Sequence, residues 1–260
     1  MIRLCVIGNS HIVAVRDGWQ QAGPFTEPFT PTFFAAPANW MAELDWQDGK
    51  LALSGRKARK VMSRLSGGVA EIDPEAFDAF LLVGMFVRLL RIARIYETHR
   101  LPAHAEEGHQ IISRAALQAA ISGIIDDSAA VRTIVKLSSR GPKPIFLIPE
   151  PLPSENIVTT GPLWAGSYMS TLHDIYTERL RAMADDKGVG LACQGADTIT
   201  KGAFTRACYS IGATQLNRGG AYGDDELLHM NSEFVAKILC EMLPRFLARL
   251  GRSTTAARQG

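Results

Sequence analysis

Short apolar runs alternate with amphipathic stretches along most of the chain. Apolar runs of about four to eight residues that stop at glycine or proline are typical of strands buried in a parallel sheet. Apolar residues spaced three and four positions apart instead indicate helices that bury one face. The predicted strands span residues 2–7, 32–36, 77–83, 144–148 and 189–193. The predicted helices span residues 12–23, 56–65, 87–98, 111–138, 168–185 and 231–250.

Two local features refine this pattern. Asp48-Gly49 predicts a two-residue turn inside a small hairpin over residues 46–53. The amphipathic stretch 111–138 is too long for one uninterrupted surface helix, so we expect a break within it. The break is expected at one of two places, Gly123 or Asp126-Asp127.

The alternation of strands and helices, without a linker, repeat or low-complexity run, predicts a doubly wound α/β fold. We expect a single three-layer α/β/α domain over residues 1–250, with a mostly parallel, flavodoxin-like sheet. Residues 251–260 are expected to form a disordered basic tail, because chain ends fray when nothing ties them down. In such a fold functional residues lie in loops after the C-terminal ends of strands.

Composition and charge narrow the class of protein. Apolar residues make up 47% and charged residues 21%, which fits a globular domain rather than a disordered chain or a coiled coil. The net charge of +2 gives no basic excess, so we expect no nucleic-acid partner. No apolar run approaches the ~20 residues that cross a bilayer, so we expect no membrane span. These features leave the oligomeric state open.

Cysteine usage and the first residues favour a cytoplasmic protein. The four cysteines have no CxxC spacing, which indicates reduced core thiols rather than disulfides or zinc ligands. The apolar run at residues 4–7 is too short for the core of a signal peptide. The chain also has no GxxxxGK[ST] or HExxH motif, and no GxGxxG after its first strand, so we expect no metal and no cofactor.

One candidate for chemistry directly follows the first predicted strand. Ser10 lies in the block Gly8-Asn9-Ser10-His11, between that strand and a helix. A serine on such a turn is exposed at the sheet edge, and its own N–H is available to a developing oxyanion. The alternative is that Ser10 only caps the helix.

A second candidate precedes the last predicted helix. His229 is preceded at three residues by Glu226 and at four residues by Asp225. A carboxylate in this loop could bond to the imidazole Nδ1–H, which leaves Nε2 free to take a proton from a serine hydroxyl. Glu226 is the preferred acid and Asp225 is the other candidate. An acidic loop with an incidental histidine is the alternative.

At these two blocks the chain resembles the SGNH (GDSL-type) hydrolase superfamily. That family carries its serine in a Gly-Asp-Ser block after the first strand, and its acid and histidine in an Asp-x-x-His block before the last helix. The corresponding residues here are Gly8-Asn9-Ser10 and Glu226-Leu227-Leu228-His229. The resemblance implies a serine esterase or acylhydrolase with a Ser-His-acid triad, acting on short-chain esters, acylated sugars or lipids.

The chain departs from the family where the resemblance implies an oxyanion donor. The family has Gly-x-Asn after its third strand, whereas this chain has Gly84-Met85-Phe86. Losing one oxyanion donor typically costs ~10²–10³ in turnover. We expect another group to replace the missing asparagine, with Asn39 as the candidate. The predicted oxyanion and substrate-binding residues are therefore Ser10, Gly84 and Asn39.

Other charged residues are lesser candidates. Glu150 lies between two prolines at a strand end, where a rigid loop could place it in the site. Arg88, Arg91 and Arg94 follow Gly84 closely and could recruit an anionic acyl substrate, although a solvated helix face is the simpler account.

The favoured function is hydrolysis of a small-molecule ester by Ser10 and His229, with weak activity if the oxyanion hole is incomplete. Two alternatives stay open at this point. One is a non-catalytic SGNH-like module that binds carbohydrate or serves as an accessory domain. The other is an O-acyltransferase, in which the same serine and histidine pass the acyl group to a sugar hydroxyl instead of water.

Overall fold

Five parallel strands form the central sheet of the protein in a computed structural model that describes residues 1–216, 220–223 and 225–256. The strand order is β10-β9-β6-β1-β2, and each neighbouring pair is parallel. The strands are β1 (Ile2–Gly8), β2 (Phe29–Ala35), β6 (Ala79–Val83), β9 (Ile145–Ile148) and β10 (Gly190–Leu191). The predicted α/β class with a parallel central sheet is confirmed.

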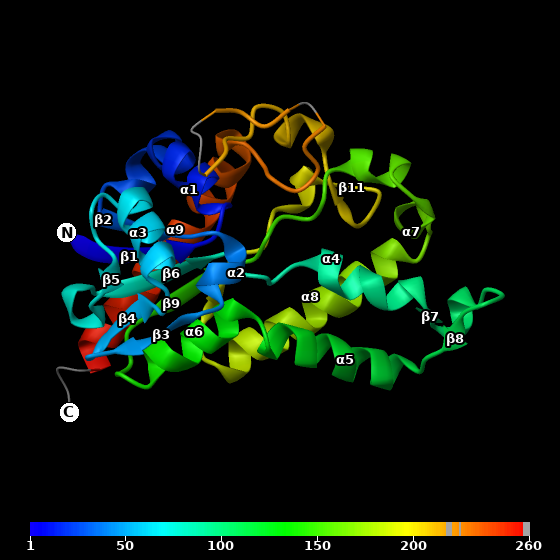
Figure 1. Ribbon diagram of the computed structural model, residues 1–260, viewed down its shortest axis with the longest axis horizontal. Coiled ribbons are helices and arrows are strands. Elements are labelled where there is room, and N and C mark those ends of the chain that lie inside the picture. Colours follow the sequence, from blue (N-terminus) through cyan, green and yellow to red (C-terminus); the bar gives the residue numbers. More distant parts are fainter. Residues whose placement is uncertain (217–219, 224, 257–260) are drawn as a thin grey trace.

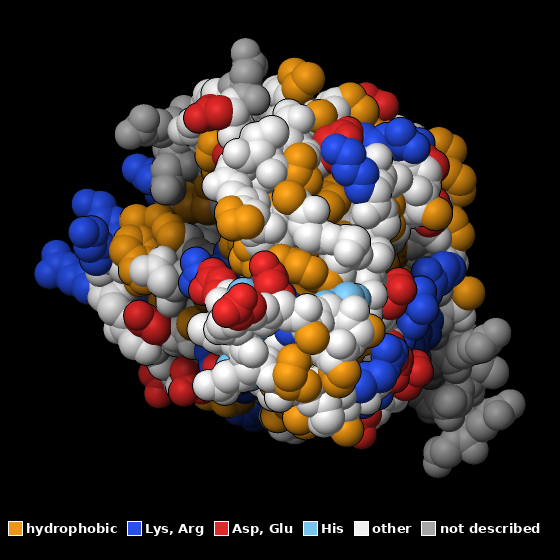
Figure 2. Space-filling view, turned by 90° about the vertical axis from the view of Figure 1, so that its right-hand side faces the viewer, with side chains coloured by type: hydrophobic (Ala, Val, Ile, Leu, Met, Phe, Trp, Pro, Cys, Tyr) orange, Lys and Arg blue, Asp and Glu red, His pale blue; other side chains and the backbone are white. Residues whose placement is uncertain are grey.

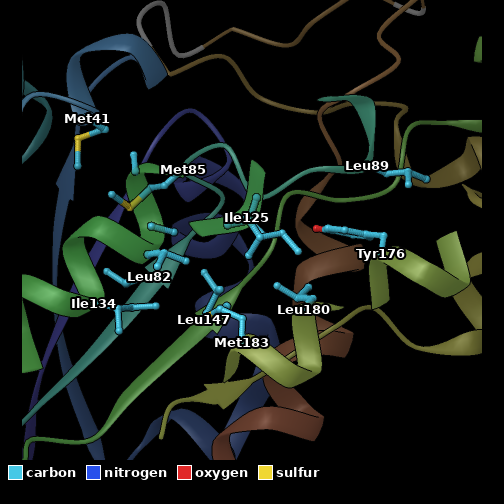
Figure 3. Packing of buried hydrophobic residues seen from close by; sticks show 14 of the residues in the cluster. Met41, Leu82, Met85, Leu89, Ile125, Ile134, Leu147, Tyr176, Leu180 and Met183 are labelled. Carbon is cyan, nitrogen blue, oxygen red and sulfur yellow. The ribbon is translucent and has the colours of Figure 1, made fainter. Parts of the chain in front are cut away.

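Helices cover both faces of this sheet (Figure 1). On one face α1 (Ile12–Trp19) packs on α9 (Ser232–Ala256), and on the other lie α6 (Ala129–Ser138) and α8 (Met169–Asp186). Successive strand side chains point to opposite faces, so each strand serves two cores. Leu81 packs in the α1/α9 core, whereas Leu82 and Leu147 pack in the α6/α8 core (Figure 3). The three-layer arrangement follows from this alternation.

Beyond the sheet, the chain extends into a helical region (Figure 1). There α8 packs against α5 (Arg114–Asp126) and α4 (Leu89–Ala93). The end of the molecule that carries this region presents acidic and basic side chains with apolar side chains between them (Figure 2). Its smaller elements are β7 (His99–Arg100), β8 (Gln110–Ile111), α7 (Pro162–Ala165), β11 (Ile199–Thr200) and β12 (Phe204–Thr205).

The remaining elements follow β2. They are α2 (Ala38–Met41), β3 (Leu44–Gln47), β4 (Lys50–Leu53), α3 (Arg56–Leu65) and β5 (Glu71–Ile72). The antiparallel pair β3/β4 is the predicted hairpin, and both Asp48 and Gly49 at its turn have positive φ angles. This left-handed pair is what a tight two-residue hairpin turn requires.

Most predicted boundaries lie close to the observed ones, with instructive exceptions. The long stretch 111–138 breaks after Asp126, because the Ser128 side chain accepts the Val131 N–H and starts α6 as a separate helix. Strand β2 begins at Phe29 rather than at residue 32. Pro31 is tolerated within it because β2 is an edge strand.

The C-terminal boundary needs a correction. Helix α9 continues to Ala256, so the tail predicted for residues 251–260 is helical in its first six residues. Gly251 does not end the helix, because one glycine costs only ~1 kcal/mol relative to alanine. Residues 257–260 lie outside the described residues.

Across the ranges that the structure covers, no helix has the length and apolar character needed to cross a membrane. The cytoplasmic location stays a prediction.

Candidate active site

Ser10 lies at the carboxyl end of β1, in the tight turn that leads into α1 (Figure 1). The Ile12 N–H donates to the Asn9 carbonyl and the Val13 N–H to the Ser10 carbonyl, which starts the helix. A side chain at Gly8 would lie 2.8 Å from the Val83 carbonyl oxygen, so glycine lets β1 pack closely on β6 just before the turn. Within the described ranges, the Ser10 N–H has no hydrogen-bond acceptor.

His229 lies directly against this serine. The Ser10 Oγ is 2.8 Å from His229 Nε2, although the two residues are 219 positions apart in the chain. On the other side of the imidazole, Nδ1 lies 3.1 Å from Glu226 Oε1. The three side chains therefore form a continuous serine–imidazole–carboxylate chain, in the arrangement expected of a nucleophile, its base and an orienting acid.

The loop before α9 holds Glu226 by local contacts. Its Oε1 also accepts the backbone N–H groups of Leu228, at 2.7 Å, and His229, at 2.9 Å. Burial raises the pKa of this carboxyl, but the hydrogen bonds from the His229 side chain and from these two N–H groups outweigh it and lower the pKa to about 2. Glu226 is thus an anion beside Nδ1, and it stabilises a positively charged imidazole.

Asp225, the other predicted acid, does not reach the histidine. Its side chain is exposed, and it makes no hydrogen bond to His229 within the described part of the chain. The spacing of three residues, rather than four, is the one that lets the loop fold the carboxylate back onto the imidazole. Of the two sequence candidates, the geometry therefore selects Glu226.

Two further aromatic rings stack on His229. The His11 ring lies 4.7 Å from it and the Tyr222 ring 4.4 Å, both nearly parallel. The Tyr222 hydroxyl is also 3.3 Å from His229 Nε2, farther than the Ser10 hydroxyl. These contacts restrict rotation of the imidazole. Sequence reasoning missed both rings, because nothing before folding indicates that either residue faces His229.

Glu150, at the end of β9, connects the loops that follow three strands. Its Oε1 accepts the Asn9 amide at 2.9 Å and the Phe86 N–H at 3.0 Å, while Oε2 lies 3.6 Å from His11 Nε2 and 3.5 Å from an Arg88 nitrogen. The carboxylate is only 5% exposed. Burial alone would raise its pKa, but His11, Arg88 and the Phe86 N–H together lower it to about 2. Glu150, which the sequence offered only as a lesser candidate, is therefore a buried carboxylate that holds the loops of the site together.

The loop after β6 has an unusual backbone. Gly84, Met85 and Phe86 have φ angles of 71°, 56° and 71°, three left-handed residues in a row. For residues with a side chain this conformation costs ~1–2 kcal/mol each. A Cβ at Gly84 would lie 2.6 Å from the Asn9 amide oxygen, so this glycine is required by contact as well as by φ. The turn aims the Phe86 N–H at Glu150.

The three residues predicted to form the oxyanion hole differ in whether they offer a free hydrogen-bond donor at the site. The Gly84 N–H donates to the Ile148 carbonyl at 2.8 Å, so Gly84 supports the site by packing and offers no free N–H. Asn39 lies in α2 with an exposed side chain, and in the described residues that side chain makes no hydrogen bond. The Phe86 ring lies under the guanidinium groups of Arg88 and Arg91. Among the predicted donors, the Ser10 N–H is left free.

The arrangement supports acyl transfer to a serine. In the portion of the chain that is described, no three His, Cys, Asp or Glu side chains are grouped so as to hold a metal ion. No protein-family model matches the sequence, and no curated protein matches it. A proposal for the function therefore rests on the geometry of the site alone. Membership of the SGNH superfamily stays a prediction.

Proposed function

We propose that this protein is a serine acyl hydrolase of the SGNH type, which cleaves the ester bond of a small ester or of an acylated carbohydrate or lipid. The observation that carries the proposal is the 2.8 Å contact between Ser10 Oγ and His229 Nε2, with Glu226 on Nδ1. A role in capping α1 would not require Ser10 to contact an oriented imidazole from the far end of the chain.

In the acylation step, Ser10 Oγ attacks the ester carbonyl carbon while its proton passes to His229 Nε2. The negative charge that develops on the carbonyl oxygen is stabilised by the Ser10 N–H. Glu226 stabilises the imidazolium by its charge and its contact with Nδ1–H. The tetrahedral adduct then collapses, and His229 gives the proton to the leaving alcohol.

In the deacylation step, water takes the place of the alcohol. His229 removes a proton from the water as it attacks the acyl carbon, and returns that proton to Ser10 Oγ when the acid leaves. The Tyr222 hydroxyl, 3.3 Å from Nε2, borders the space that the alcohol or the water occupies. If a sugar hydroxyl attacks instead of water, the same machinery performs O-acyl transfer.

The test is active-site labelling with a fluorophosphonate probe, which reacts with an activated serine. The wild type should be labelled at Ser10, and Ser10→Ala should remove the label. Ser167→Ala, at an exposed serine away from the site, should be labelled like the wild type. Equal labelling of Ser10→Ala and the wild type would overturn the proposal, and no labelling of the folded wild type would favour a non-catalytic binding module.

A further inference from the structure

A cavity of about 240 Å³ lies next to the proposed catalytic residues, between α8 and α9. It is formed at the carboxyl ends of β9 and β10, the edge of the sheet at which Ser10 also lies. Its walls are mainly apolar and include Ile148, Leu180, Phe234 and Ile238. Its volume is close to the lower end of ligand pockets, about 300–1,000 Å³.

This cavity adjoins the space beneath the proposed nucleophile. A second, smaller cavity of about 20 Å³ is bordered by Ser10 and His229. The two cavities share five bordering residues: Ile148, Pro149, Pro151, Phe234 and Ile238. Because the same side chains face both spaces, no more than one layer of side chains separates them. These five residues are all apolar, so the route of a chain attached at Ser10 into the larger cavity crosses one apolar layer.

The charges around the larger cavity suit an uncharged chain. Glu150 borders it, and its carboxylate is already paired with Asn9, His11 and Arg88. Burial raises the pKa of the Cys193 thiol, which keeps that group neutral. Arg181 also borders the cavity, and its side chain is exposed.

Tyr176 adds a hydrogen-bonding group to these apolar walls. Its ring projects from α8 into the buried cluster and its hydroxyl points away from the helix (Figure 3). That hydroxyl is buried without a hydrogen-bond partner in the described part of the chain. An unsubstituted acyl chain leaves this hydroxyl unpaired, whereas a hydroxyl or keto oxygen along the chain would pair with it.

The sheet sets the length of this route. Ser10 follows β1 and the far end of the cavity follows β10, with β6 and β9 between them. Three strand spacings of ~4.8 Å amount to ~14 Å. An extended chain advances ~1.2 Å per bond, so it needs on the order of ten bonds to cover that distance.

We propose that this cavity binds the acyl chain of the substrate, and that the chain has roughly eight to twelve carbon atoms. The inference rests on the proposed function, because Ser10 is taken as the attachment point. It narrows the substrate class from small esters in general to esters of medium-chain acids.

The first experiment measures kcat/KM for p-nitrophenyl acetate, butyrate, octanoate, decanoate and palmitate. Each buried methylene contributes up to about fourfold to binding, so decanoate should exceed acetate by at least about tenfold. Palmitate is longer than the route and should fall below decanoate. A preference for acetate, or no dependence on chain length, would overturn the inference.

A matched pair of variants locates the effect. Thr177 on α8 borders the larger cavity, whereas Thr171 on the same helix borders neither of the two cavities. Both threonines are half-buried. Thr177→Trp should lower the decanoate-to-acetate ratio of kcat/KM by about tenfold, by filling the space of roughly two methylenes. Thr171→Trp should keep the wild-type ratio, and a lowered ratio in both variants would overturn the assignment.

A binding measurement separates the cavity from the chemistry. The Ser10→Ala protein should bind decanoate, used as the probe in isothermal titration calorimetry, and Thr177→Trp in this background should weaken binding. Failure to bind the probe, with Ser10 still labelled by fluorophosphonate, would overturn the cavity assignment and leave the proposed function intact. Binding of the probe without any labelling of Ser10 would support the cavity and overturn the function.

Discussion

Two glutamates hold two stacked imidazoles at the centre of the site, and they do so in opposite ways. Glu226 contacts His229 and Glu150 contacts His11, and the two rings lie 4.7 Å apart. Each carboxyl has its pKa lowered to about 2. Glu226 achieves this with partners no more than three residues away, whereas Glu150 takes partners 64 and 141 residues away.

Because their partners differ, the loss of each glutamate should have a different consequence. Glu226 belongs to one short loop, so its loss disturbs the histidine and little else. Glu150 ties the ends of β1, β6 and β9 together, and it fixes the turn that carries Ser10 through Asn9. We therefore expect changes at Glu226 to appear mainly in turnover, besides the stability that its own lowered pKa contributes, and changes at Glu150 to appear mainly in stability.

The largest expected effect is on catalysis at Glu226. Glu226→Gln should lower kcat by about 10⁴-fold, because an amide beside Nδ1 no longer fixes the imidazole tautomer or stabilises its charge. The neighbouring Asp225→Asn changes an exposed carboxyl and should leave kcat within about twofold. Steady-state hydrolysis of p-nitrophenyl esters measures both. An equal loss in the two variants would contradict the assignment of the acid.

The next effect is on the pH dependence of stability at Glu150. Folding lowers the pKa of this carboxyl from 4.5 to about 2, so its contribution is complete above pH 4.5 and is lost as the pH falls towards 2. The lowered pKa thereby contributes about 3 kcal/mol to the free energy of unfolding at neutral pH. Urea unfolding at neutral pH should show Glu150→Gln less stable than the wild type by about this amount, and the difference should shrink in acid.

A surface carboxylate supplies the control for that measurement. Glu71 is half-exposed and lies 3.9 Å from Lys50, so Glu71→Gln should change the unfolding free energy by no more than ~1 kcal/mol. A Glu150→Gln protein as stable as this control, at neutral pH, would show that the buried carboxylate does not tie the loops together.

The smallest expected effect is at Asn39. Because its side chain is exposed and makes no hydrogen bond within the described residues, Asn39→Ala should change kcat by less than about twofold. A loss of ~10²–10³ in the same assay would instead identify Asn39 as an oxyanion donor.

The sequence indicates those features of the site that lie within one short segment, and few of the contacts between distant segments. The turn after β1 and the spacing of Glu226 from His229 are properties of short segments, so both were predictable. The role of Glu150 depends on partners that meet only when three strands align, and single-sequence patterns carry no such register. Nothing in the sequence pattern indicates the contact of Tyr222 with His229 either.

The left-handed turn after β6 illustrates a second limit. Gly84 indicates a special backbone position, but Met85 and Phe86 have side chains that normally avoid positive φ. Their conformation is imposed by tertiary contacts, since the Phe86 N–H is held by Glu150 and the Met85 carbonyl accepts the Ala130 N–H. Local preference would have predicted an ordinary turn, and the tertiary structure overrides it.

The contact between α1 and α9 has a consequence for the biosynthesis of the protein. The two helices approach so closely that a Cβ at Gly18 would lie 2.6 Å from the Ser232 carbonyl oxygen, and this packing brings the start of α9 beside Ser10. The 219 residues from His11 to His229 take about 10–40 s to translate at ~5–20 residues per second. Throughout that time a nascent chain carries the serine without its base. On the proposed function, esterase activity would begin only after this last part of the chain has left the ribosome.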